Sequence, residues 1–75
     1  MTGLPVISGK DLIKILVKEG FVVNRQKGSH VRLAKMTDDG KITVTVPLHD
    51  ELDRGTLISI LKGAEITKEE FLDLI

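Results

Sequence analysis

The feature that most constrains the fold of this chain is an alternation of apolar and polar residues on both sides of a short turn. In the segment from His30 to Met36, Val31 and Leu33 alternate with His30, Arg32 and Ala34, and from Ile42 to Val46 three apolar residues alternate with Thr43 and Thr45. The segment Asp38–Gly40 separates the two runs, and its glycine can take the positive φ that a tight hairpin turn requires. A period of two residues is typical of a strand with one covered face. The pattern therefore predicts a β-hairpin with one apolar and one polar face.

A further strand is expected before this hairpin. Phe21–Arg25 is rich in residues that favour strands, and Gln26–Ser29 has the composition of a tight turn. Pro47 closes the last strand because proline has no N–H to donate to a sheet ladder. The three strands are predicted to form an antiparallel meander whose apolar face needs a cover.

Helical patterns on either side of the sheet can supply that cover. Residues 9–19 repeat Leu12 and Leu16 at helical spacing, after Ser8 as a possible cap and before Gly20 as a helix-ending residue.

The carboxyl-terminal part predicts two more helices. One spans residues 54–62, with Gly63 expected to end it. A short one follows the capping box Thr67-Lys68-Glu69-Glu70. The expected architecture is a single α+β domain over residues 1–75, in the order helix, three-stranded antiparallel sheet, helix and short carboxyl-terminal helix.

Composition narrows the function classes. Seventy-five residues allow one modest core. Without cysteine, no disulfide or thiolate metal site is available, and two histidines leave few nitrogen ligands, so neither a metal nor a cofactor is expected. No signal peptide or membrane span is evident, and a soluble, cytoplasmic protein without membrane contact is predicted.

The charge is zero overall but unevenly distributed. Residues 1–36 carry a net charge of +5, and residues 37–75 carry −5. This asymmetry indicates a basic face that suits nucleic acid. The alternative is that both halves are simply solvated.

The segment Lys27-Gly28-Ser29-His30 is the most informative place for chemistry. Gly28 permits a turn and a close approach of phosphate, and Lys27 and Arg25 add positive charge. His30 begins a strand on the polar face, and imidazole exchanges protons near neutral pH. These groups suit cleavage of RNA by its own 2′-hydroxyl, without a metal. The alternative is an ordinary exposed histidine after a glycine turn.

Two other features have a structural and a functional interpretation. His49 precedes Asp50-Glu51, so it could cap the following helix, pair with a carboxylate, or assist His30. Lys10, Lys14 and Lys18 form a solvated helix face or a row that contacts a phosphate backbone. The two aromatic residues, Phe21 and Phe71, are expected in the core, which argues against recognition of bases by stacking on aromatic side chains.

The motifs "SGKDLIKIL", "GFVVNRQKGSHVRL", "VTVPLHDEL", "GTLISILKGA" and "ITKEEFLDLI" cover most of the chain. On these motifs, and above all on "KGSHVRL" with a downstream "VPLH", the chain resembles the HicA toxins of toxin–antitoxin pairs. The resemblance implies a fold like the double-stranded-RNA-binding domain and metal-independent cleavage of messenger RNA, neutralised by a HicB-type antitoxin. The family's catalytic histidine falls on His30, and its flanking glycine and serine fall on Gly28 and Ser29.

Three hypotheses follow. The first is an endoribonuclease with His30 as the acid–base residue and an RNA-binding set made of Lys10, Arg25, Lys27, Gly28, Ser29 and Arg32. The second is a non-catalytic RNA-binding module that uses the same basic face. The third is an interaction domain whose basic face meets only an acidic protein.

Overall fold

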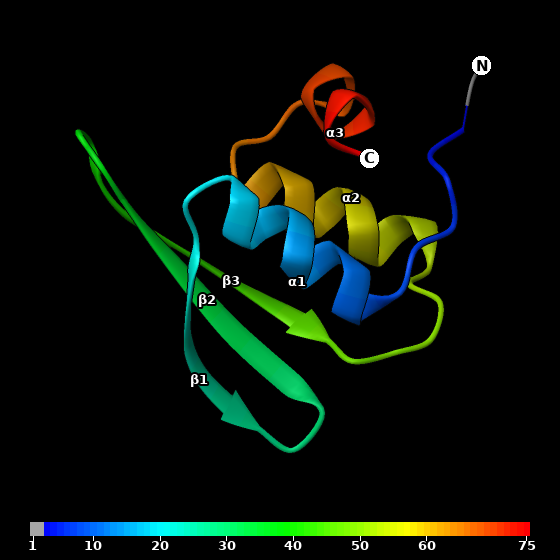
Figure 1. Ribbon diagram of the computed structural model, residues 1–75, viewed down its shortest axis with the longest axis horizontal. Coiled ribbons are helices and arrows are strands. Elements are labelled where there is room, and N and C mark those ends of the chain that lie inside the picture. Colours follow the sequence, from blue (N-terminus) through cyan, green and yellow to red (C-terminus); the bar gives the residue numbers. More distant parts are fainter. Residues whose placement is uncertain (1–2) are drawn as a thin grey trace.

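The computed structural model describes residues 3–75 as three helices and one sheet (Figure 1). Their order along the chain is α1 (Gly9–Lys18), β1 (Val22–Lys27), β2 (His30–Thr37), β3 (Gly40–Pro47), α2 (Arg54–Gly63) and α3 (Lys68–Leu74). The α+β class and the predicted order of elements are confirmed. Figure 1 shows α1 and α2 side by side, with the β2–β3 hairpin projecting beyond them.

Helix α1 begins and ends where the sequence predicts. The Ser8 side chain accepts a hydrogen bond from the Asp11 N–H at 3.0 Å, which satisfies one of the free donors of the first turn. Gly20, just beyond the helix, has a φ of 99°. The left-handed region is open to glycine at little cost, so the chain can turn there directly into β1.

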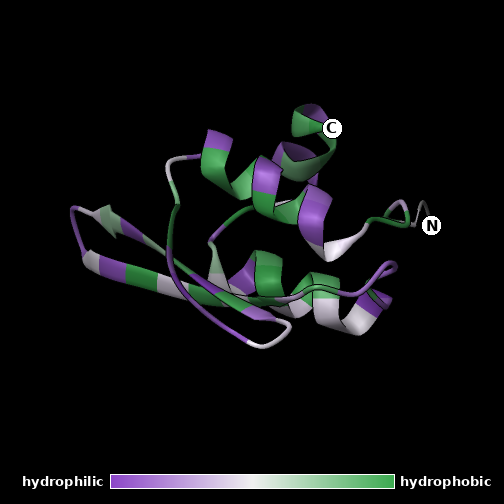
Figure 2. Ribbon diagram, turned by 60° about the horizontal axis from the view of Figure 1, so that its bottom comes forward, coloured by the Kyte–Doolittle hydropathy of each residue, from purple (hydrophilic) through white to green (hydrophobic). Residues whose placement is uncertain are grey.

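The sheet is antiparallel with strand order β1-β2-β3, so β2 lies in the centre. Val31 and Leu33 of β2 are buried and His30 and Arg32 are exposed, as predicted, and green and purple segments alternate along the hairpin in Figure 2. The apolar side chains meet α1, α2 and α3 in one core, whose buried members are Leu12, Ile15, Leu16, Phe21, Val31, Leu33, Val44, Val46, Leu52, Leu57, Ile60, Leu61, Ala64, Ile66 and Phe71. The opposite face of the sheet, the outer face, is left to water.

The first hairpin is tighter than predicted. Gln26 and Lys27 belong to β1, and the turn is reduced to Gly28 and Ser29. The expectation of a four-residue turn over Gln26–Ser29 was wrong, because Lys27 pairs with His30 and extends the ladder to the turn itself. Gly28 has a φ of 60°, which a two-residue hairpin turn demands.

A bulge in β1 decides which of its residues face water. Phe21 and Arg25 are four residues apart, so strict alternation would place both on one face of the sheet. The register shifts between Val23 and Arg25, which leaves Asn24 as the extra residue. Phe21 is therefore buried in the core while Arg25 lies on the outer face.

Helix α2 ends by a different device from the one predicted. Gly63 is its last residue, and the left-handed residue is Glu65, with a φ of 59°. The Glu65 N–H donates to the Lys62 carbonyl, and the Ile66 N–H donates to the Leu61 carbonyl at 2.9 Å, which is a Schellman motif. A methyl group on Gly63 would lie 3.3 Å from a Val44 methyl group, so this glycine lets α2 approach β3 closely.

The segment before α1 is joined to the end of β3. The Gly9 N–H donates to the His49 carbonyl at 2.9 Å, and a side chain on Gly9 would overlap the Pro47 carbonyl. Helix α3 starts with the predicted capping box, in which Thr67 and Glu70 exchange hydrogen bonds. These contacts fix both ends of the helical layer.

Replacing Glu65 by glycine is expected to stabilise the protein. A side chain at positive φ costs about 1–2 kcal/mol, and glycine removes this cost. Glycine also loses more backbone entropy on folding, so the net gain is about 0.5–1 kcal/mol. Thermal unfolding should show a midpoint higher by roughly 2–6 °C. The control Glu51→Gly, in an exposed loop without positive φ, should not raise the midpoint. An equal rise in both variants would contradict a strained Glu65.

The cap of α2 predicts a pH dependence of stability. Hydrogen bonds from the side chain and backbone of Thr56 hold the pKa of Asp53 below its ordinary value of 3.8. A lowered pKa contributes stability above the unfolded value, and this contribution is lost as pH falls through the folded value. Wild type should exceed Asp53→Asn in unfolding midpoint at neutral pH, and the gap should close below about pH 3.8.

Asp50→Asn, in the exposed loop before α2, controls for the change in net charge. A gap between wild type and Asp53→Asn that is the same at every pH would show that the carboxylate charge at the cap has no role.

Candidate functional site

His30 is the first residue of β2 and lies at one end of the outer face. Its register partners are Lys27 in β1 and Pro47 in β3, so it has a strand on each side. The turn beside it is held from both directions. The Gln26 side-chain amide donates to the Gly28 carbonyl at 3.1 Å, and the Leu48 N–H donates to the Ser29 carbonyl at 2.7 Å. His30 is thus exposed to solvent but carried on a fixed backbone.

A shallow hollow of about 280 Å³ surrounds this histidine on the outer face. The residues that line it are Arg25, Lys27, His30, Arg32 and Thr45. No acidic side chain is among them. We call this group the basic hollow.

The electrostatics of the basic hollow favour an anion. Arg25 and Arg32 are register partners on neighbouring strands, and like charges placed opposite each other repel. An anion between them removes that repulsion. Guanidinium groups bind phosphate through two parallel N–H donors, and the Lys27 ammonium adds a third cation.

Proton transfer is available at the same place. An imidazole gives and takes protons near neutral pH, and His30 shares the hollow with all three cations. The basic hollow can therefore bind a phosphate group and exchange a proton with an oxygen atom attached to it.

Most of the sequence-predicted site residues come together. Arg25, Lys27 and Arg32 line the hollow with His30, while Gly28 and Ser29 form the adjoining turn. Lys10 is different: it is exposed in the first turn of α1 and does not line the hollow. Its helix lies in the layer against the covered side of the sheet.

Thr45 is a lining residue that the site prediction missed. It pairs with Arg32 across β2 and β3, which places its hydroxyl group on the outer face. The alternation of Thr43 and Thr45 with buried valines already placed it on the polar face. This alternation, together with the register that pairs Thr45 with Arg32, is the sequence signal that could have identified Thr45 as a lining residue.

His49 does not belong to the basic hollow. It is exposed in the loop after β3, and its carbonyl accepts the Gly9 N–H. The residue that caps α2 is Asp53, so the expectation that His49 might cap that helix was wrong. Helix α2 begins at Arg54, so Asp53 and not His49 lies in the N-cap position, where its carboxylate oxygen accepts a hydrogen bond from the Thr56 N–H.

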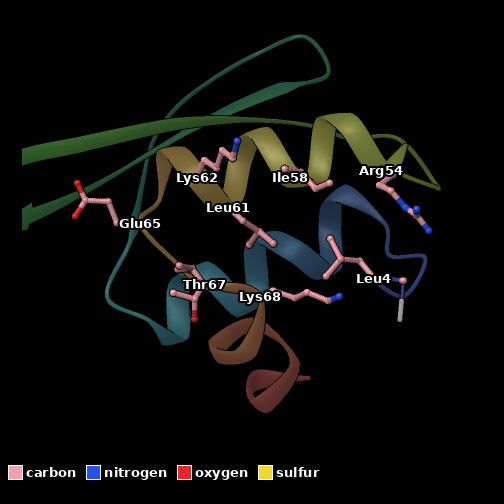
Figure 3. A pocket seen from close by; sticks show the side chains of 10 residues that line it. Leu4, Arg54, Ile58, Leu61, Lys62, Glu65, Thr67 and Lys68 are labelled. Atoms are coloured by element: carbon pink, nitrogen blue, oxygen red, sulfur yellow. The ribbon is translucent and has the colours of Figure 1, made fainter. Parts of the chain in front are cut away.

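A second and more apolar hollow, of about 520 Å³, lies away from the outer face (Figure 3). Its lining comes from the N-terminal segment, α2 and the start of α3, with Leu4, Ile58 and Leu61 among the residues that Figure 3 labels. It contains no histidine. The exposed His30 and the cluster of cations are both in the basic hollow.

Residues 3–75 contain neither a membrane-spanning helix nor a cluster of metal ligands. No helix there is long and apolar enough to cross a membrane. Within the same range, no group of three or more histidine, cysteine, aspartate or glutamate side chains is placed to hold a metal ion.

The fold and the site together define a small α+β domain whose open sheet face presents a histidine among cations. Comparison with protein-family models gives a match over residues 9–66 to the family described as the HicA toxin of bacterial toxin–antitoxin systems. This match covers most of the chain, including every residue of the basic hollow, and the chain belongs to the HicA toxin family. A comparison with curated proteins returned no match.

Removing the His30 side chain is expected to leave the fold intact. The side chain is exposed, so His30→Ala should change the free energy of unfolding by no more than about 0.5 kcal/mol. Its neighbour three residues along, Leu33, is fully buried, and Leu33→Ala should lose about 2–5 kcal/mol. Chemical denaturation of both variants tests this difference. A large loss in His30→Ala would mean that the histidine has a structural role.

Proposed function

We propose that this protein is a metal-independent endoribonuclease toxin that cleaves messenger RNA, with His30 as its acid–base residue. The observation that carries the proposal is the basic hollow, where one exposed histidine lies among Arg25, Arg32 and Lys27. Membership of a toxin family supports an activity directed against a cellular component. An RNA phosphate is an anion of the size and charge that this arrangement favours.

The proposed reaction uses the RNA's own 2′-hydroxyl as the nucleophile. Its oxygen forms a bond to the adjacent phosphorus, and the bond from phosphorus to the 5′-oxygen of the next nucleotide breaks. The products are a 2′,3′-cyclic phosphate and a 5′-hydroxyl group. One proton leaves the 2′-oxygen and one is added to the departing 5′-oxygen, and His30 exchanges a proton with one of these oxygens.

The cations act on the charge that develops during this reaction. The phosphorus carries an extra negative charge when five oxygens surround it, and fixed positive groups stabilise that state more than the ground state. Arg25 and Arg32 are held opposite each other by the sheet register, so they can contact two oxygens of one phosphate. Thr45 offers a hydroxyl donor beside them, and Gly28 leaves room for the backbone of the RNA.

The antitoxin is part of the proposal. A toxin of a toxin–antitoxin system has a protein partner that neutralises it, and we assign a HicB-type antitoxin to this role. By covering the outer face it would exclude RNA from His30. Both partners and the messenger RNA meet in the cytoplasm.

The test compares wild type with His30→Ala and His49→Ala on a labelled messenger RNA transcript in the presence of EDTA. Wild type and His49→Ala should yield fragments that end in a cyclic phosphate. His30→Ala should be slower by about 10²–10⁴-fold, the usual contribution of an acid–base group. A transcript with 2′-deoxy nucleotides at the cleaved sites should stay intact, because its nucleophile is absent.

Two outcomes would contradict the proposal. Cleavage that EDTA abolishes would require a metal mechanism. Intact RNA with every protein, together with retarded migration in a native gel, would favour an RNA-binding module that uses the same face without catalysis.

A further inference from the structure

The outer face of the sheet continues beyond the basic hollow as a strip of apolar residues. Val22, Ala34 and Met36 follow Arg25 and Arg32 along β1 and β2, and we call them the apolar strip. Val22 is 67% exposed and Met36 is 74% exposed, the largest value among the exposed large apolar residues that the structure describes. Val22 and Ala34 are register partners, so the strip crosses from one strand to the next.

The residues of the apolar strip are not part of the hydrophobic core. The helices cover the other face of the sheet, where Val31 and Leu33 are buried. Single exposed apolar residues are common on protein surfaces and need no explanation. Here the residues are neighbours on one wet face. They line a hollow of about 410 Å³ together with Gly20, Asn24, Lys35 and Lys41. Such a patch beside a charged site indicates a ligand that is both apolar and anionic.

Polar and charged groups border the strip. The bulge in β1 frees Asn24 from regular pairing and places it beside Val22 at the strip's edge. Lys41 is the register partner of Met36 on the other side. A cation thus lies at the far end of the face, as the arginines lie at the near end.

The length of the face suits a segment of several nucleotides. A strand rises about 3.3 Å per residue, so the six steps from His30 to Met36 span roughly 20 Å. Asp38 and Asp39 follow at the tip of the hairpin, which projects beyond the helices in Figures 1 and 2. Their negative charges repel a phosphate backbone, so the part of the outer face that suits RNA ends there.

We infer that the apolar strip binds the unpaired bases that flank the cleaved linkage, so that the substrate is single-stranded RNA lying along the outer face. The inference rests on the proposed function. An unpaired base exposes a flat, weakly polar surface that apolar side chains can cover, whereas the bases of a duplex bury these surfaces against one another. Lys41 neutralises a phosphate of the same strand, and Asn24 offers an amide to a base edge.

The occupant must account for both the apolar and the cationic parts of this face. Single-stranded RNA does so, with bases on Val22 and Met36 and phosphates on Lys41 and the basic hollow. Its path is continuous from His30 to the strip because His30, Ala34 and Met36 lie on β2 and Val22 pairs with Ala34 from β1. A protein partner that used the strip alone would leave RNA cleavage unaffected by changes there, and the experiment below separates the two.

The experiment measures steady-state cleavage of short RNAs that contain one site mapped with wild-type protein. One RNA ends close to the cleaved linkage, and two others extend it by four nucleotides on either flank. For wild type, the extension on one flank should lower KM about tenfold with little change in kcat. Annealing a complementary strand to that flank should remove the gain.

The variant Val22→Thr/Met36→Gln keeps the approximate shape of the strip but makes it polar. We expect it to cleave the short RNA as wild type does and to lose the tenfold gain from extension. The matched control is Val6→Thr/Leu72→Gln, which makes the same two kinds of change at exposed positions outside the sheet. This control should retain the gain. Circular dichroism should show the same fold in all three proteins.

The outcomes separate this inference from the function on which it rests. If wild type cleaves the short RNA but extension does not lower KM, the strip does not bind bases. The same conclusion follows if the variant Val22→Thr/Met36→Gln keeps the lower KM on extended RNA. If wild type cleaves none of the RNAs, the proposed endoribonuclease function itself is overturned.

Discussion

Burial on one side only of strand β2 organises both the core and the site. Val31 and Leu33 join the core with residues of α1 and α2, while His30 and Arg32, which alternate with them, stay in water. The free energy of burying the first pair fixes the orientation of the second, because a slip of one residue would exchange the two faces. The site therefore needs no separate support: the same packing that stabilises the domain holds the histidine at the surface.

Pairing of β1 with β2 brings further cations beside His30 and Arg32. A hairpin turn at Gly28 returns the chain so that Lys27 lies beside His30, and the bulge at Asn24 keeps Arg25 outside while Phe21 enters the core. Opposed arginines on an open sheet gain nothing from each other. A bound anion would relieve their repulsion, so the register of the sheet favours an anion at this place.

Membership of the HicA toxin family gives this arrangement a biological context. An open sheet face, accessible along its whole length, suits a long and flexible polymer better than a small molecule that needs an enclosing pocket. The same openness suits inhibition by a protein, since one surface laid over the face would exclude the substrate. The apolar hollow between the N-terminal segment, α2 and the start of α3 shares no residue with the basic hollow (Figure 3).

The local pattern of the sequence determined the secondary structure and the two faces of the hairpin. The period of two residues placed His30 and Arg32 on the polar side, and Ser8 and Thr67 marked helix starts, because these signals act over a few residues.

Only the tertiary structure decided which side chains meet. The bulge at Asn24, the placement of Thr45 beside Arg32 and the distance of Lys10 from the basic hollow all depend on pairing or packing between different elements. Such contacts are set by the register and close packing of whole elements, which no short stretch of sequence contains.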